Sequence, residues 1–212
     1  MLSDLLSLDQ AAERLGVSRR RVEAMVLNGQ LPAERLGRQW VVSPQAVRRT
    51  AGVRSAGGRP VRPEKAWALI AELPGAVVRG PAGLDAARRK VRPRAEHVDV
   101  YVHPGAMGVL VDGGVVGGRD AAAAAGAPVD TDGVHDVYVR RSEVAELLAR
   151  AGAERTLEGA NVHVHVVDDE VWLFEDGCRT TGPWVAWLDL ADREDRAADT
   201  LLDRLIGGRL RA

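Results

Sequence analysis

The chain has 212 residues, of which 46% are hydrophobic and only 4% aromatic, so a core must be built mostly from Val, Leu and Ala. One cysteine, Cys178, excludes an internal disulfide, no run approaches the roughly 18 apolar residues of a membrane span, and no signal-peptide pattern opens the chain, so we expect a cytoplasmic protein. The net charge of −1 hides a division: residues 1–95 hold 18 Lys and Arg against 8 Asp and Glu, whereas residues 96–212 hold 11 against 22.

The first residues predict a short helix that ends in a tight turn. Ser7 is placed to cap a helix beginning at Leu8, and Gln10 stands three residues on, as in a capping box. Apolar residues at helical spacing give this helix one buried face. Gly16 then supplies the turn.

A second helix follows the turn. Ser18 is placed as its N-cap, and we expect the helix to run to about Asn28, with Gly29 as its C-cap. Its inner face is apolar, and its first turn holds three consecutive arginines, Arg19, Arg20 and Arg21.

A hairpin and a third helix complete the first fifty residues. Glu34–Leu36 and Gln39–Val42 alternate like two strands around a turn at Arg38. Pro44 stands at the first position of a third helix. Two helices, a turn and a hairpin in this order predict a winged helix-turn-helix domain over residues 1–50.

The same residues resemble the excisionase/MerR-type winged helix family over about the first 50 positions. The similarity lies in AAxxLGVSRxxV at 11–22, NGxLP at 28–32 and RLGRQW at 35–40. In that family the helix after Val-Ser enters the major groove, and the wing touches the flanking backbone. The resemblance implies double-stranded DNA as the partner, bound by Ser18, Arg19, Arg20, Arg21, Glu23, Arg38 and Gln39.

Glu23 departs from the aromatic or basic residue that this family often has at the same position. A carboxylate there would repel a phosphate or accept a hydrogen bond from a cytosine amine. The alternative to DNA binding is a small helical bundle with solvated arginines. We favour DNA binding because the turn spacing, the second cap and the wing coincide.

Residues 51–63 are rich in Gly, Pro, Ser and Arg and predict a linker. Residues 64–95 predict a basic helical connector, with one helix over 63–73 ended by Pro74 and another over 84–91. A basic run closes the second helix. Its side chains are either solvated or make a second set of phosphate contacts, and the sequence leaves both open for Arg88, Arg89, Lys90, Arg92 and Arg94.

From residue 96 the pattern alternates between strand and helix, with a weak internal repeat. DVYVHP at 99–104 and DVYVRR at 136–141 start 37 residues apart, and each opens a strand followed by a helix. The second helix is capped by Ser142 and ended by Gly152, and a short helix is expected over 121–125. The predicted fold class is therefore α+β: a winged helix-turn-helix and a mixed α/β C-terminal domain over 96–212.

Val162–Val167 alternates strictly and predicts a hairpin with residues 171–174. His163 and His165 share one strand face, which is either an exposed or interface face or, less favoured, a metal pair, because no cysteine or carboxylate stands at ligand spacing. The glycines at 113–118 lack the phosphate-loop pattern and are turn glycines. We expect no catalytic residues, no metal and no cofactor, and Cys178 is interpreted as a passive thiol.

The C-terminal residues give a second, diffuse resemblance, mostly in apolar and small positions. PWVAWLDL at 183–190 and DRAADTLLDRL at 195–205, with GRP at 58–60, are similar to helix-turn-helix proteins encoded beside AbiEii-like nucleotidyltransferase toxins. Their role is that of AbiEi-type antitoxins, which repress their own operon. The resemblance implies a nucleotidyltransferase-like toxin as a partner. The toxin's own motif is absent here, so this chain would be the regulator.

The sequence thus predicts a sequence-specific DNA-binding transcriptional regulator that is not an enzyme, and an autorepressing antitoxin in particular. A single small module reads few base pairs, so a homodimer on a repeated operator is expected. The acidic half binds a protein partner or self-associates. Two alternatives remain: an excisionase-like recombination accessory factor, and an enzyme in the C-terminal half that the first module targets to DNA.

Overall fold

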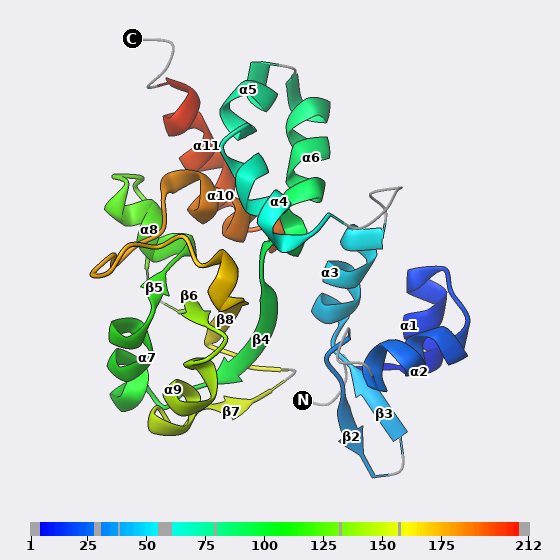
Figure 1. Ribbon diagram of the computed structural model, residues 1–212. Helices are drawn as coiled ribbons and strands as arrows, with labels where there is room; N and C mark the ends of the chain where they lie inside the picture. Colours follow the sequence, from blue (N-terminus) through cyan, green and yellow to red (C-terminus); the bar gives the residue numbers. More distant parts are fainter. Residues whose placement is uncertain are drawn as a thin grey trace. The chain divides into compact units, whose positions relative to one another are not determined.

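The computed structural model describes residues 5–27, 31–37, 39–54, 61–78, 80–131, 133–156 and 158–207, which form two compact units (Figure 1). Residues 5–54 belong to the first unit, and residues 61–156 and 160–207 make up the second. A three-stranded and a five-stranded sheet stand among many helices, so the predicted α+β class is confirmed. In the part of the chain that is described, none of the helices has the length and apolar character needed to cross a bilayer.

The first unit consists of three helices and a small antiparallel sheet of strand order β1-β3-β2. Its elements are β1 (Leu6–Ser7), α1 (Leu8–Leu15), α2 (Arg19–Leu27), β2 (Glu34–Leu36), β3 (Gln39–Val42) and α3 (Pro44–Arg54). The expected helices and hairpin are all present. Strand β1 was not predicted, because two residues are too few to show an alternating pattern.

Local capping signals fix where these helices begin. Ser7 and Gln10 form both hydrogen bonds of the capping box, and Gly16 ends α1 in the left-handed conformation at φ 62°. The Ser18 hydroxyl accepts from the Arg21 N–H at 3.3 Å. Helix α3 continues to Arg54, so the segment predicted as a linker from residue 51 begins as helix. The predicted C-cap of α2, Gly29, lies outside the described residues.

The second unit combines five strands with helices on both faces of the sheet. Its helices are α4 (Pro63–Ile70), α5 (Leu73–Val78), α6 (Gly80–Val91), α7 (Met107–Gly113), α8 (Gly118–Ala124), α9 (Val144–Arg150), α10 (Pro183–Asp192) and α11 (Ala197–Gly207). Short 3₁₀ helices lie at Arg92–Arg94, Pro104–Ala106 and Asp169–Val171. The strands are β4 (Glu96–Tyr101), β5 (Val115–Val116), β6 (His135–Arg140), β7 (Glu154–Arg155) and β8 (Val162–Val167).

The sheet has the order β5-β6-β8-β4-β7, with β6 and β8 parallel and the other pairs antiparallel. Strands β6 and β8 are buried on both faces of the sheet. Val137 and Val164 point into a core shared with α7 and α9, whereas Tyr138 belongs to the core formed with α4, α8 and α10. His163 and His165 share the second face, as predicted, but they are buried rather than exposed.

The expected hairpin after β8 was wrong. Residues 172–175 form no strand, and β8 pairs instead with β6 and β4, which lie far from it in sequence. Alternation identifies a strand but not its partner. The predicted cap at Ser142 was also wrong, because its hydroxyl bonds to the Asp169 carboxylate and Glu143 precedes α9 without a side-chain cap.

The segment at 64–95 differs from the predicted connector. Trp67 and Leu73, together with Leu84 and Val91, are buried in the same core as α10. Pro74 does not end a helix but lies in the first turn of α5, where the missing N–H costs no hydrogen bond. The basic helices are therefore part of the second unit.

The turn between α10 and α11 holds a backbone outlier. Glu194 has φ 58° and is exposed, at a helix C-terminal position that usually holds glycine. A residue other than glycine in the left-handed conformation costs roughly 1–2 kcal/mol, and a glycine removes this strain. Part of that gain is lost, because glycine also raises the conformational entropy of the unfolded chain. We expect Glu194→Gly to raise the free energy of unfolding by up to about 1 kcal/mol, measured by urea denaturation. Glu194→Ala keeps the strain and is expected to give no gain; equal gains in both variants would contradict the explanation.

Candidate nucleic-acid interface and a buried ionic cluster

Helix α2 presents a defined outer surface because its inner face is fixed in the core. Val22 and Met25 are buried against α1, α3 and the sheet. At 100° per residue, the positions opposite them are 20, 23, 24 and 27. Arg20 and Glu23 are exposed there, and Leu27 keeps 70% of its surface accessible. The outer stripe is therefore mixed in charge and apolar at its C-terminal end.

The three arginines are not equivalent. Arg19 lies 2.8 Å from the Asp9 carboxylate of α1, and both side chains are 64% exposed. This pair is screened by solvent, but it leaves Arg19 partly neutralised. Arg20 and Arg21 are exposed and have no ion-pair partner among the described residues. The sequence did not indicate the ion pair between Asp9 and Arg19. The two residues stand ten positions apart, and only the packing of α1 against α2 brings their side chains together.

The wing is exposed along β2 and anchored along β3. Trp40 is half-buried and packs on the core of the first unit, and it thereby anchors the wing. The guanidinium of Arg35 lies 5.7 Å from its ring, in cation–π range. Gln39 is exposed at the start of β3, and Arg38 lies outside the described residues. Arg35 is a cation of the wing that the sequence did not single out.

The basic run that begins in the last turn of α6 and continues into the following 3₁₀ helix is largely committed to contacts within the second unit. Arg88 donates to the Ala191 carbonyl at 2.6 Å, and Arg89 pairs with Asp85 at 3.1 Å. Lys90 is exposed. Arg92 lies 3.9 Å from Asp192 and is mostly buried. Arg94 is 0% exposed, so its predicted phosphate contact is incompatible with the fold.

Arg94 instead anchors an ionic cluster between α10 and the sheet. Its guanidinium donates to the Asp189 carboxylate at 2.7 Å and to Asp192 at 3.0 Å. The Tyr138 hydroxyl donates to the same Asp189 oxygen at 2.6 Å. The N–H of Gly118 donates to the other oxygen at 3.1 Å, in a left-handed turn at φ 52°. Both oxygens of the Asp189 carboxylate therefore accept hydrogen bonds.

Asp136 on β6 extends the cluster toward β8. It accepts from Arg193 and, at 2.9 Å, from His165 Nε2. Burial alone raises the pKa of the Asp136 carboxyl, but the charge of Arg193 and the hydrogen bond from His165 outweigh it and hold the pKa well below its usual range. Asp136 therefore stays ionised inside the core.

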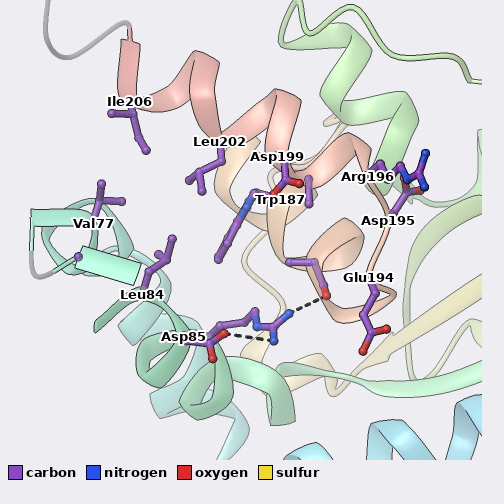
Figure 2. A pocket seen from close by; sticks show the side chains of 14 residues that line it. Val77, Leu84, Asp85, Trp187, Glu194, Asp195, Arg196, Asp199, Leu202 and Ile206 are labelled. Carbon is purple, nitrogen blue, oxygen red and sulfur yellow. Dashed lines mark hydrogen bonds and ion pairs between the residues drawn. The ribbon is translucent and has the colours of Figure 1, made fainter. Parts of the chain in front are cut away.

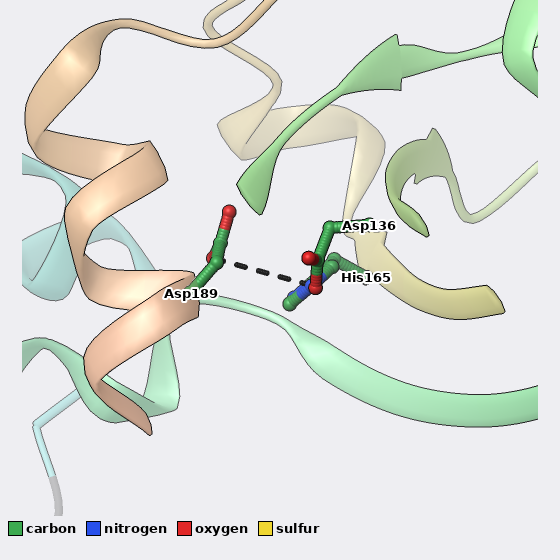
Figure 3. Close-up of side chains that lie close together, drawn as sticks. All are labelled: Asp136, His165 and Asp189. Atoms are coloured by element: carbon green, nitrogen blue, oxygen red, sulfur yellow. Dashed lines mark hydrogen bonds and ion pairs between the residues drawn. The ribbon is translucent and has the colours of Figure 1, made fainter. Parts of the chain in front are cut away.

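Asp136 of β6, His165 of β8 and Asp189 of α10 converge in the core (Figure 3). Each offers one potential ligand atom, and these three atoms lie within 4.8 Å of one another. Such a set could in principle hold a cation. However, Arg193 and Arg94 already bind the two carboxylates, and a divalent ion would lie beside both guanidiniums. The arrangement fits an internally neutralised structural cluster better than a metal site.

The pair of His135 and Asp120 gives a pH-dependent contribution to the stability of the fold. His135 Nδ1 lies 2.8 Å from Asp120, with both side chains about one-fifth exposed, and this hydrogen bond raises the pKa of His135 despite burial. The fold thus favours protonated His135, so the stabilisation is complete below the unfolded pKa of about 6.5 and is lost as pH rises through the folded value. We expect the unfolding free energy of the wild type to exceed that of Asp120→Asn most at low pH.

The measurement is urea unfolding of both proteins at pH 5.5, 7.0 and 8.5. His135→Gln is the matched control and should show the same flattened pH dependence as Asp120→Asn. A wild-type advantage that does not shrink with rising pH would show that the pair adds no titrating contribution.

Residues 5–50 match a family model described as a helix-turn-helix domain. The match covers the whole of α1, α2 and the hairpin. Neither the curated proteins nor the solved structures gave a match to the chain.

Proposed function

We propose that the chain is a sequence-specific DNA-binding regulator that inserts α2 of its helix-turn-helix domain into the major groove. The observation that supports this most directly is the outer face of α2, where Arg20 is exposed and free of ion pairs among the described residues. A guanidinium in this position is suited to a guanine edge or a phosphate. Residues 1–59 of the first unit hold 10 Arg against 5 Asp and Glu, and this excess adds a general attraction for DNA.

In the proposed complex the residues of α2 divide their roles by position. Arg20 and Glu23 face the base edges, and Glu23 accepts from a cytosine amine. Arg21 and the partly neutralised Arg19 flank them and contact phosphates. The hairpin wing, with Arg35 on β2, touches the backbone beside the groove.

The test is the salt dependence of binding to duplexes selected by the full chain from a random-sequence pool. With phosphate contacts from Arg19, Arg21 and Arg35, the logarithm of the association constant for one copy should fall against the logarithm of salt with a slope of about −3, and two copies on one duplex should double that slope. Fluorescence anisotropy between 50 and 300 mM salt measures it. Failure to enrich any sequence, or binding that salt leaves unchanged, would overturn the proposal.

The finer proposal is an antitoxin that represses its own operon. Its support is the resemblance of residues 183–205 to regulators encoded beside nucleotidyltransferase toxins. A reporter driven by the upstream region of the gene should be repressed by the chain, and co-expression should rescue growth from the neighbouring toxin. A neighbouring integrase gene with selected DNA that maps to an attachment site would instead favour the excisionase-like alternative.

The second unit is proposed to have no catalytic activity of its own. The buried carboxylates of Asp136 and Asp189 are bound by arginines, and Cys178 is half-buried with its thiol donating to the Thr180 carbonyl at 3.2 Å.

Two copies of the chain on a repeated operator would provide the sequence specificity that one small helix-turn-helix domain lacks.

A further inference from the structure

The second unit contains a cleft of about 460 Å³ between α5 and α6 on one side and α10 and α11 on the other (Figure 2). Its apolar lining comes from all four helices. Clefts of about 300–1,000 Å³ with a mostly apolar lining are of the size that binds small organic molecules. The apolar part is formed by Val77, Leu84, Trp187, Leu202 and Ile206.

Some of the charged groups around this cleft neutralise one another. Asp85 lies 3.3 Å from Arg88, whose guanidinium also donates to a backbone carbonyl of α10. Asp195 is bound by Arg119 of α8 at 2.8 Å and caps the start of α11. These groups add little net charge to a ligand in the cleft, because each is matched by an opposite charge nearby.

Two carboxylates and one guanidinium remain. Glu194, Asp199 and Arg196 are exposed at the cleft, none of them has an ion-pair partner within the described part of the chain, and their net charge is −1. Figure 2 shows Asp199 beside Trp187, whereas Arg196 lies at the edge toward α8. Glu194 has φ 58°, and strained non-glycine residues of this kind tend to occur at functional positions.

We propose that this cleft binds a small apolar organic cation. The apolar lining buries the body of the ligand, and the Glu194 and Asp199 carboxylates face its positive charge. The residues of the second unit, 60–156 and 160–212, hold 24 Asp and Glu against 19 Lys and Arg, and this net negative charge favours cations over anions at longer range as well. The inference is independent of DNA binding, since every residue involved belongs to the second unit and binding is measured without DNA.

The experiment compares two probes of nearly identical shape and opposite charge. Tetraphenylphosphonium should bind the full chain saturably, one per chain, by isothermal titration calorimetry, and should raise the melting temperature. Tetraphenylborate should bind at least about tenfold more weakly, because it meets two carboxylates instead of being attracted by them.

Variants locate the site. Glu194→Gln with Asp199→Asn should weaken phosphonium binding about tenfold without affecting the fold, since both side chains are exposed. Asp203→Asn is the matched control: it removes an exposed carboxylate from the same helix α11 that does not line the cleft, and binding should be unchanged. Leu202→Trp should fill the cleft and abolish binding, with thermal unfolding as the check on folding.

Several results would overturn the proposal. The proposal fails if tetraphenylphosphonium does not bind saturably, or if tetraphenylborate binds equally well or more tightly. It also fails if the variant with both Glu194→Gln and Asp199→Asn binds phosphonium with unchanged affinity. Binding of a basic amphipathic peptide in the absence of phosphonium binding would assign the cleft to a protein partner. Concentration-dependent dimerisation that Leu202→Trp prevents would assign it to a second copy of the chain.

Discussion

Replacing Arg20 with glutamate should lower the affinity of the full chain for its selected duplex by about 2–3 kcal/mol, or roughly 30- to 150-fold. The side chain lies on the outer face of α2, opposite the buried Val22 and Met25, and no carboxylate among the described residues pairs with it. The variant both removes a contact and places a negative charge against DNA. Fluorescence anisotropy at 150 mM salt measures the loss.

Arg150→Glu is the matched control, since it makes the same charge change at an exposed position of α9 in the second unit. It should leave binding within a factor of about two, because Arg150 does not belong to the helix-turn-helix domain that is proposed to contact DNA. Equal losses in both variants would mean that net charge, and not the surface of α2, determines affinity.

Arg19→Glu provides an internal comparison, because Asp9 already lies 2.8 Å from that guanidinium. We expect a smaller loss there than at Arg20. Arg20→Ala then separates two roles: a phosphate contact lowers the salt slope by about one, whereas a base contact relaxes sequence preference at one position of the site. An unchanged affinity in Arg20→Ala and Arg20→Glu would exclude α2 as the reading helix.

The first unit could be predicted well from sequence because its signals are local. Ser7 with Gln10, Gly16 and Ser18 each act within three or four residues, and each has the predicted role in the structure. What the sequence did not indicate is the partner of Arg19. Asp9 lies on the preceding helix, and only the angle between the two helices brings the carboxylate within reach.

The second unit was harder because its decisive pairings are long-range. Strand β8 was recognised by alternation, but its parallel pairing with β6 depends on the packing of helices on both faces of the sheet. The basic run at 88–94 has the composition of a phosphate-binding surface. The burial of Arg92 and Arg94 became visible only once the structure placed Asp189 and Asp192 of α10 beside them.

That cluster leads to the second large effect. Arg94→Ala should destabilise the second unit by about 3–5 kcal/mol, because it leaves the fully buried Asp189 carboxylate without its ion-pair partner and leaves Asp192 with Arg92 alone, at 3.9 Å. Tyr138 and Gly118 still donate to Asp189, but neutral donors do not compensate a buried charge. Urea unfolding of the full chain, followed by tryptophan fluorescence, measures it, since four of the five tryptophans belong to the second unit.

Arg89→Ala is the control, because Arg89 pairs with Asp85 at an exposed position and should contribute less than about 1 kcal/mol. Asp189→Asn tests the direction of the argument. It keeps the shape of the side chain and leaves Arg94 with Asp192 as a counter-ion, so its cost should be smaller than that of Arg94→Ala. If Asp189→Asn were the more damaging variant, the cluster would depend on the hydrogen bonds of Asp189 rather than on charge balance. If neither variant lost stability, the guanidinium would not be compensating the buried carboxylates, and the argument against a cation at Asp136, His165 and Asp189 would lose its basis.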